Sequence, residues 1–193
     1  MSIMNNIVSL SRWVKYLLVF ITLLQMSSFA MVMSLGELEN GAYLYTLNWG
    51  GFYSHFSIDF EHTWQSIAQV LEAEGLHAGW ILGSVELMPC LVIYFFLYRL
   101  FSLYQTRQIF TQANFNYLSY IALTCLAWLF ISLLYPLLIT LLLRVFERAE
   151  ATSFYFSFGS QELYYLLTSL VIYCIAWIMK QAAELHDDAE LTV

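Results

Sequence analysis

The sequence predicts an all-α transmembrane fold, a four-helix membrane bundle with a small extracytoplasmic insertion between the first two spans. Of its 193 residues, 61% are hydrophobic and 11% are charged, and the mean hydropathy is +0.68. A soluble domain has about a quarter of its residues charged, so lipid must cover part of this surface. Four stretches also approach the ~20 apolar residues that cross a bilayer as a helix. We therefore interpret residues 1–193 as a single membrane domain.

The predicted spans cover residues 16–35, 80–98, 115–143 and 163–179. The first could instead be a signal peptide with a small-x-small site at 28–30, but its apolar stretch exceeds the core of such signals, which favours a retained span. The third would be roughly 43 Å long as a helix, against a hydrocarbon core of about 30 Å. Tilt, a kink at Pro136 or protrusion from the membrane must absorb the excess.

Basic residues predict the orientation of the spans. Segment 36–78 contains no Lys or Arg. With four spans, five of the seven basic residues lie on the side opposite this segment: Arg12, Lys15, Arg99, Arg107 and Lys180. The other two, Arg144 and Arg148, lie on the same side as segment 36–78. Because Lys and Arg collect on the cytoplasmic side, we expect a bacterial inner-membrane protein with both termini in the cytoplasm. The elbow at 99–114 and the tail at 180–193 are then cytoplasmic, and 36–78 is the outer loop.

The outer loop has two predicted elements. Residues 42–60 alternate around a Trp-Gly-Gly turn, which predicts a hairpin. Its second strand would divide its side chains between two faces: Phe52, Ser54, Phe56, Ile58 and Phe60 on one, and Tyr53, His55, Ser57 and Asp59 on the other. In 62–75, four apolar residues at helical spacing, Trp64, Ile67, Val70 and Leu71, predict an amphipathic helix that stops at Gly75. Together they could form a cap whose Trp and Tyr residues suit the lipid interface.

Metal and thiol chemistry find little support. His55, Asp59, Glu61, His62 and His77 are ligand types, but their spacing matches no defined site. The alternative to a metal site is ordinary solvated polarity of the loop, and we predict no metal and no cofactor. Cys90, Cys125 and Cys174 each lie in an apolar run, without metal-site spacing. We interpret them as small packing residues.

Glu86 is the acid predicted to lie within a span. A carboxylate in that position is a functional candidate, for proton coupling, a cation site or gating. A hydrogen-bonded structural role near the interface is the alternative.

No catalytic or phosphate-binding motif is present, so we predict that the protein is not an enzyme. The net charge of −7 argues against direct nucleic-acid binding.

The elbow and the tail carry the predicted partner-binding residues. Thr111 is a suitable N-cap for the third span, with Asn114 as an alternative start, and the elbow arginines could reach lipid phosphates. The tail continues the fourth helix and is acidic, which suits a basic cytosolic partner. Membrane anchoring and solvated fraying are the simpler interpretations. The candidate residues are Arg107, Phe110, Thr111, Asn114, Glu184, Asp187, Asp188 and Glu190.

These two segments resemble the small bacterial four-span family known as domain of unknown function 2975. The elbow matches at Leu100, Phe101, Tyr104, Ile109, Phe110, Thr111, Asn114 and Leu118, and the tail at Glu184, Leu185, Glu190, Leu191, Thr192 and Val193. The family's usual elbow glycine is Arg107 here, which puts its tight turn in question. The resemblance implies a membrane component whose gene often lies beside that of a small helix-turn-helix regulator.

The leading hypothesis is a non-enzymatic regulatory membrane protein that holds such a cytosolic regulator through its elbow and tail, with the outer cap exposed to a cue. One alternative is a small transporter or channel subunit that uses Glu86. Another is a structural subunit of a larger membrane assembly. Besides the regulator, we expect membrane lipid as a partner.

Overall fold

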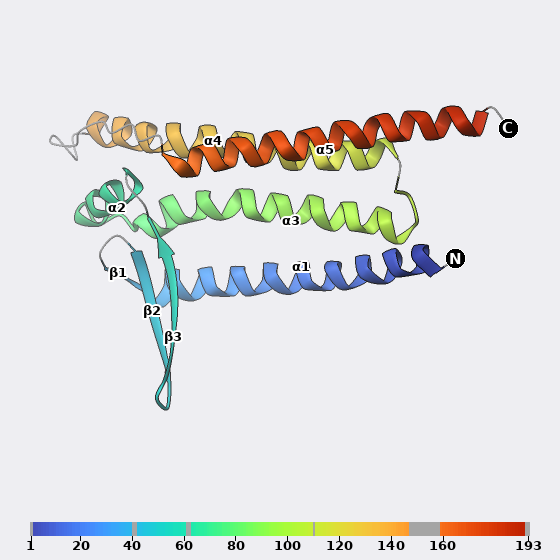
Figure 1. Ribbon diagram of the computed structural model, residues 1–193. Helices are drawn as coiled ribbons and strands as arrows, with labels where there is room; N and C mark the ends of the chain where they lie inside the picture. The colour runs from blue at the N-terminus through green and yellow to red at the C-terminus, as the bar shows by residue number, and fades with distance from the viewer. Residues whose placement is uncertain (1, 40–41, 61–62, 110, 147–158, 192–193) are drawn as a thin grey trace. The chain divides into compact units, whose positions relative to one another are not determined.

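The computed structural model describes residues 2–39, 42–60, 63–109, 111–146 and 159–191. Its four long helices are α1 (Ser2–Leu35), α3 (Ser84–Gln105), α4 (Gln112–Val145) and α5 (Ser160–Leu191) (Figure 1). Between α1 and α3 lie β1 (Glu37–Glu39), β2 (Ala42–Trp49), β3 (Phe52–Asp59), the helix α2 (Thr63–Ala73) and the π-helical turn η1 (Gly79–Gly83). The predicted fold class, with a small insertion between the first two spans, is confirmed.

Four helical segments are long and apolar enough to cross a bilayer: Asn5–Leu35, Gly79–Gln105, Gln112–Val145 and Ser160–Leu185. The chain is therefore a multi-pass membrane protein. Each segment contains one predicted span and extends past it at one or both ends. The predicted spans end where the apolar run ends. The observed helices are longer because helical hydrogen bonding continues through the polar residues beyond that run.

Contacts divide the chain into two compact units. We call Met1–Thr22, Pro89–Leu129 and Ser160–Val193 the elbow unit, and Leu23–Met88 with Phe130–Gly159 the cap unit. Three of the long helices contribute a segment to each unit, and each unit is described by itself.

The cap unit contains a three-stranded antiparallel sheet in the order β1-β2-β3. Its β2–β3 hairpin pairs Trp49 with Phe52 at the turn and Ala42 with Asp59 at the other end, which confirms the predicted hairpin. Gly50 and Gly51 have positive φ angles of 58° and 106°, a conformation that glycine adopts without a steric penalty. The three-residue β1, paired with β2, was not predicted because it is too short to show alternation.

A hydrophobic core lies beneath the sheet and α2. Its buried members are Val32, Met33, Tyr43, Phe60, Ile67, Ala68, Leu71, Ala78, Leu82, Ile139 and Leu143. The apolar face predicted for α2 is confirmed, with Ile67 and Leu71 in the core and Trp64 packed against it. The helix stops at Gly75 as predicted. Gly75 has φ 72°, its amide donates to the Glu72 carbonyl (3.0 Å), and the Leu76 amide donates to the Leu71 carbonyl (2.8 Å), which is a Schellman motif.

Pro136 does not interrupt α4, because α2 satisfies the carbonyl that the proline frees. A helical proline has no N–H to donate to the carbonyl four residues earlier, here that of Ser132. The indole N–H of Trp64 donates to this carbonyl at 3.2 Å, and the Trp64 ring stacks on Tyr135 with 5.6 Å between centroids. Beyond Pro136, Ile139 and Leu143 are buried in the cap core. The part of α4 that follows Pro136 therefore packs with one of its faces against the cap core.

This indole bond predicts coupling between Trp64 and Pro136. Trp64→Phe should destabilise the cap by about 1 kcal/mol, because it removes the part-buried indole hydrogen bond to the Ser132 carbonyl. In a Pro136→Ala background the alanine amide can donate to the same carbonyl, so the Trp64→Phe penalty should be smaller. A double-mutant cycle by SDS titration in detergent micelles measures the difference. Equal penalties in both backgrounds would contradict the assignment.

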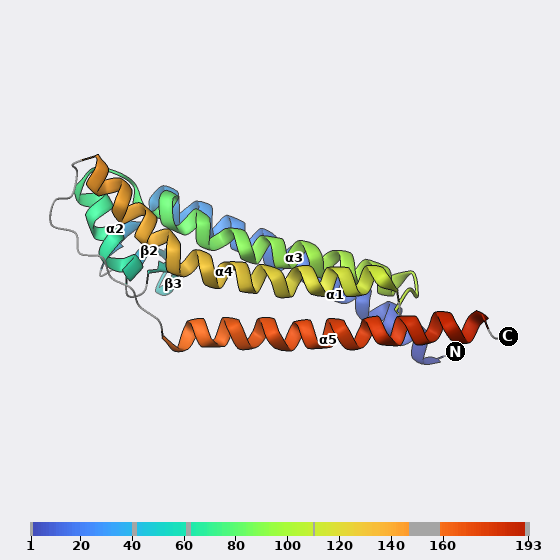
Figure 2. The same cartoon turned by 90° about the horizontal axis from the view of Figure 1, so that it is seen from above.

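In the elbow unit, α3 and α4 form an antiparallel pair joined by the elbow (Figure 2). The Phe96 ring lies 6.3 Å from that of Tyr117 and 5.1 Å from that of Tyr120. Helix α5 contacts α4 through small residues: the Ser169 hydroxyl donates to the Ala122 carbonyl at 2.8 Å, and a helical stripe of three, Ser169, Ala176 and Ala183, is buried. Small residues let transmembrane helices approach closely.

The three cysteines differ in their exposure. Cys125 is buried and Cys90 is partly buried, which fits the predicted packing role. Cys174 is exposed on α5, so that interpretation is wrong for this residue.

Candidate functional site

The elbow is a tight turn in which Arg107 occupies a glycine-like position. Arg107 has φ 62°, its amide donates to the Tyr104 carbonyl (3.2 Å), and the Gln108 amide donates to the Leu103 carbonyl (3.0 Å). These two bonds make a Schellman motif, so the turn that the resemblance associates with glycine is present in this chain. A non-glycine residue in this conformation costs about 1–2 kcal/mol, which the surrounding contacts must offset.

Asn114 stabilises the elbow from inside. The side chain is fully buried, and its amide nitrogen donates to the carbonyls of Gln108 (3.0 Å) and Ile109. Thr111 has the predicted N-cap position, since its carbonyl accepts from the Asn114 amide at 3.0 Å. The predicted side-chain cap is wrong, because the Thr111 hydroxyl has no hydrogen-bond partner among the described residues. Asn114 is thus a residue of the turn as well as of α4.

The outer surface of the elbow is polar. Thr106, Arg107, Gln108 and Gln112 are exposed, and one guanidinium nitrogen of Arg107 donates to the Asn5 side chain of α1 at 3.3 Å. Of the predicted partner-binding residues, Arg107 is therefore accessible while Asn114 is not. Phe110 lies outside the described residues.

Three basic side chains of the elbow unit lie against aromatic rings. The Lys15 ammonium is 4.4 Å from the Tyr98 ring centroid and donates to the Gln105 side chain at 3.1 Å. Arg99 donates to the Tyr117 hydroxyl at 3.3 Å. Lys180 lies 5.5 Å from the ring centroids of both Phe115 and Trp177. Basic and aromatic side chains collect at the boundary of a bilayer, so we name Lys15, Arg99 and Lys180 the cation girdle.

The girdle residues are one hydrocarbon thickness from the other end of their spans. Twenty positions separate Lys15 from Leu35, Gly79 from Arg99, and Ser160 from Lys180. Each interval is about 30 Å of helix, the thickness of the hydrocarbon core. On this spacing we expect the elbow and the segment of α5 after Lys180 to lie outside the hydrocarbon.

The tail continues α5 as predicted, and the helix runs to Leu191. Glu184 is exposed and lies 3.8 Å from Lys180. Leu185, the last residue of the candidate span Ser160–Leu185, is 71% exposed. The side chains of Asp187, Asp188 and Glu190 lie outside the described part of the chain.

Glu86 belongs to the cap unit and not to the elbow unit. It lies in the first turn of α3, directly after η1, and its side chain is exposed.

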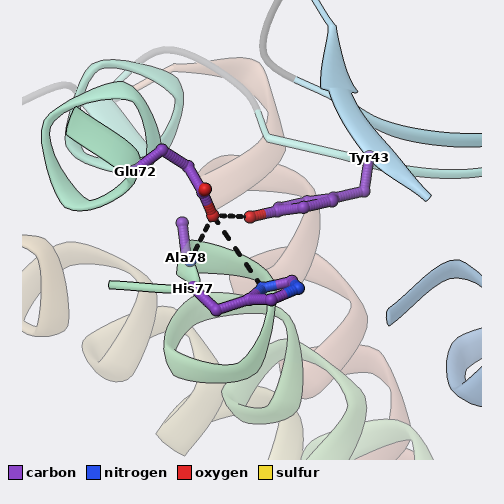
Figure 3. A network of polar contacts seen from close by, with 4 residues as sticks. All are labelled: Tyr43, Glu72, His77 and Ala78. Atoms are coloured by element: carbon purple, nitrogen blue, oxygen red, sulfur yellow. Dashed lines mark hydrogen bonds and ion pairs between the residues drawn. The ribbon is translucent and has the colours of Figure 1, made fainter. Parts of the chain in front are cut away.

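A polar network in the cap unit was not predicted (Figure 3). The Glu72 carboxylate of α2 accepts hydrogen bonds from the Tyr43 hydroxyl of β2 and from the Ala78 amide at 2.8 Å. His77 Nδ1 lies 3.8 Å from the same oxygen, and the His77 ring stacks on Tyr43 at 5.0 Å. One carboxylate thus ties the hairpin and α2 to the start of the second span.

Sequence reasoning missed this network because Glu72 has the spacing of an ordinary solvent-facing helix acid. Tyr43 gives no stronger signal than the other tyrosines of the hairpin. In the sequence, His77 stands out only as a residue type that binds metals. Among the described residues, no three His, Cys, Asp or Glu side chains converge as a metal site, while Glu61 and His62 lie outside them.

Comparison with known proteins gives one family match. The family described as "Protein of unknown function (DUF2975)" matches residues 64–193, from α2 through the elbow to the tail. No curated protein and no solved structure matches the chain. The matched range covers more than half of the sequence and leaves α1 and the sheet outside. The chain therefore belongs to the DUF2975 family.

Proposed function

We propose that the protein is a non-enzymatic regulatory protein of the bacterial inner membrane, which binds a small basic helix-turn-helix regulator at its cytoplasmic elbow and tail. The carrying observation is that α5 stays helical for eleven positions past Lys180. This extension has four acidic residues, Glu184, Asp187, Asp188 and Glu190, and no Lys or Arg.

The chemistry of this extension suits a basic protein partner. DNA-binding domains are basic, and complementary charge speeds and orients association. The exposed side chain of Leu185 adds apolar contact area for a partner to this charged surface. A pre-formed helix and elbow also lower the entropy lost on binding. The Lys and Arg distribution supports the cytoplasmic orientation.

Charge removal from the tail tests this proposal. The triple variant Glu184→Gln, Asp187→Asn, Asp188→Asn should reduce recovery of the regulator from cytosol about tenfold, equivalent to ~1.4 kcal/mol. Binding by the unchanged protein should also weaken as salt screens the charges. The measurement is quantitative affinity capture with the tagged full chain in detergent. The matched control removes three acids from the cap unit, Glu37→Gln, Glu39→Gln and Glu74→Gln.

Two single variants test the elbow and the transporter alternative separately. Arg107→Gly removes the side chain while favouring the observed backbone turn, so weaker capture would report contact by the guanidinium. Glu86→Gln should leave capture unchanged, whereas it should abolish flux if the protein were a transporter. The proposal would be overturned if the tail variant, the cap control and the unchanged chain recovered equal amounts of the regulator. It would also be overturned if the cytosolic proteins captured by the unchanged chain included no DNA-binding protein.

A further inference from the structure

The two faces of the β2–β3 hairpin differ in polarity, one being richer in apolar residues than the other. Strand register places Tyr45 opposite Phe56 and Leu47 opposite Ser54 on one face, which also holds Tyr43, Ile58 and Trp49. The other face pairs Thr46 with His55 and Leu44 with Ser57. On this second face, Thr46 and His55 share a hydrogen bond of 3.0 Å. The hairpin is therefore amphipathic.

Only the inner half of the apolar face is covered by the described residues. Tyr43 is buried in the cap core, and Tyr45, Phe56 and Ile58 pack against it. Trp49, at the end of β2, is 68% exposed. Figure 1 shows the hairpin running outward from its base, across the direction of the part of α1 that belongs to the cap unit. On this face of the outer half, Trp49 and Ser54 are exposed and Leu47 is half-buried, so the described residues leave it only partly covered.

The base of the hairpin lies at the end of two spans. A Cβ on Gly79 would lie 3.1 Å from the Tyr43 ring and 2.5 Å from the sulfur of Met33, and one on Gly83 would lie 3.7 Å from Ile58. Met33 is in the last turns of the first span, and Gly79 begins the second. These span ends meet the headgroup layer, so the hairpin leaves its base at headgroup depth.

The charge distribution favours lipid as the occupant of the open face. Segment 36–78 contains six acidic residues and no Lys or Arg, yet residues 44–58 contain no Asp, Glu, Lys or Arg. The acids lie instead in β1, at the hairpin base and in and around α2. Trp and Tyr side chains concentrate at the headgroup layer. Trp49 is the exposed aromatic on the apolar face among the described side chains, while the exposed Tyr53 lies on the opposite face, beside Asn48.

We propose that the outer half of the hairpin, residues 46–55, lies in the headgroup layer beside the helices, with Leu47 and Trp49 directed at lipid. At about 3.4 Å per residue, Trp49 is some 20 Å along the strand from Tyr43. The hairpin is then an interfacial anchor that fixes the depth and rotation of the cap unit in the membrane. This inference does not depend on the proposed regulatory function.

Spin labels on opposite faces of β3 test the proposal. Ser54→Cys and Ser57→Cys are matched substitutions of exposed serines, made in a full chain whose native cysteines are replaced by alanine. In nanodiscs of phosphatidylethanolamine and phosphatidylglycerol, oxygen should relax the Ser54 label more than a water-soluble nickel chelate does. The Ser57 label should show the reverse. Greater relaxation by nickel at both sites would overturn the proposal, and shielding of Ser54 from both reagents would show a protein occupant instead.

Adjacent charge substitutions separate lipid contact from folding. Leu47→Glu places a carboxylate on the apolar face, while Thr46→Glu places one on the polar face of the same strand. With lipid as the occupant, Leu47→Glu should reverse the reagent preference of the Ser54 label and Thr46→Glu should preserve it. Near-unchanged circular dichroism would show that both variants keep the fold. The same response to both substitutions would contradict an interfacial anchor.

Discussion

Gly36→Ala is expected to disrupt the junction between α1 and the sheet. A Cβ at Gly36 would lie 2.4 Å from the Val32 carbonyl oxygen and 3.2 Å from the Leu44 carbonyl oxygen. Both neighbours are backbone atoms, so no side-chain rotation can relieve the overlap. Overpacking of this kind costs about 1–3 kcal/mol or more. The loss should appear in SDS titration of the full chain and as faster proteolysis of the hairpin.

Gly83→Ala is the matched control for this substitution. Its added Cβ would lie 3.3 Å from the Phe29 ring edge and 3.7 Å from the Ile58 side chain. Side chains can yield where backbone cannot, so the cost should be well below that of Gly36→Ala. A Gly36→Ala variant as stable as the Gly83→Ala control would show that the described junction is wrong.

Asn114→Ala is expected to loosen the elbow. The substitution removes the donor to the carbonyls of Gln108 and Ile109, at a site that is fully buried. Gln108 is exposed and Ile109 is half-buried, so water can partly replace the lost donor, and a loss of about 1–3 kcal/mol is expected. SDS titration measures the loss, and hydrogen exchange should show faster exchange at the amides of residues 106–112.

Asn116→Ala provides the comparison, because its side chain makes an exposed hydrogen bond with Gln112 at 3.3 Å. Exposed substitutions of this kind change stability by about 0.5 kcal/mol or less. Similar losses for the two asparagine variants would mean that Asn114 does not stabilise the turn through its buried amide.

Periodicity in the sequence was enough to predict most of the architecture. Long apolar runs predicted the four helices, alternation around Gly50 and Gly51 predicted the hairpin, and Gly75 marked the end of α2. Each of these signals is local, since it depends on residues within one turn or one strand. Local physical chemistry therefore specifies the elements of this fold.

Features that depend on partners distant in sequence were not predictable in this way. The indole of Trp64 satisfies a carbonyl freed by Pro136, 72 positions later, and the Glu72 carboxylate binds the Tyr43 hydroxyl of a neighbouring strand. No spacing rule connects such residues. The turn at Arg107 was also doubtful from sequence, because propensity disfavours arginine with a positive φ and the contacts that hold it are not visible in the chain.

The sequence predicted the candidate site as two segments, the elbow and the tail. The structure shows which described residues of these segments are accessible. Arg107 and Glu184 are exposed, while the buried Asn114 acts through the turn. A hydrophobic residue was also missed, since Leu185 kept helical spacing with the apolar stripe and gave no sign of its exposure. Burial depends on the packing of α5 against α4, which composition does not encode.

The central claim is that the elbow and tail face the cytoplasm, where a regulator could bind them. Cysteine accessibility in whole cells tests it most directly, with Gln108→Cys in the elbow and Ser57→Cys in the hairpin, both exposed positions, in an otherwise cysteine-free chain. A membrane-impermeant maleimide should label position 57 in intact cells and position 108 only after the inner membrane is permeabilised. Labelling of position 108 in intact cells would contradict the account.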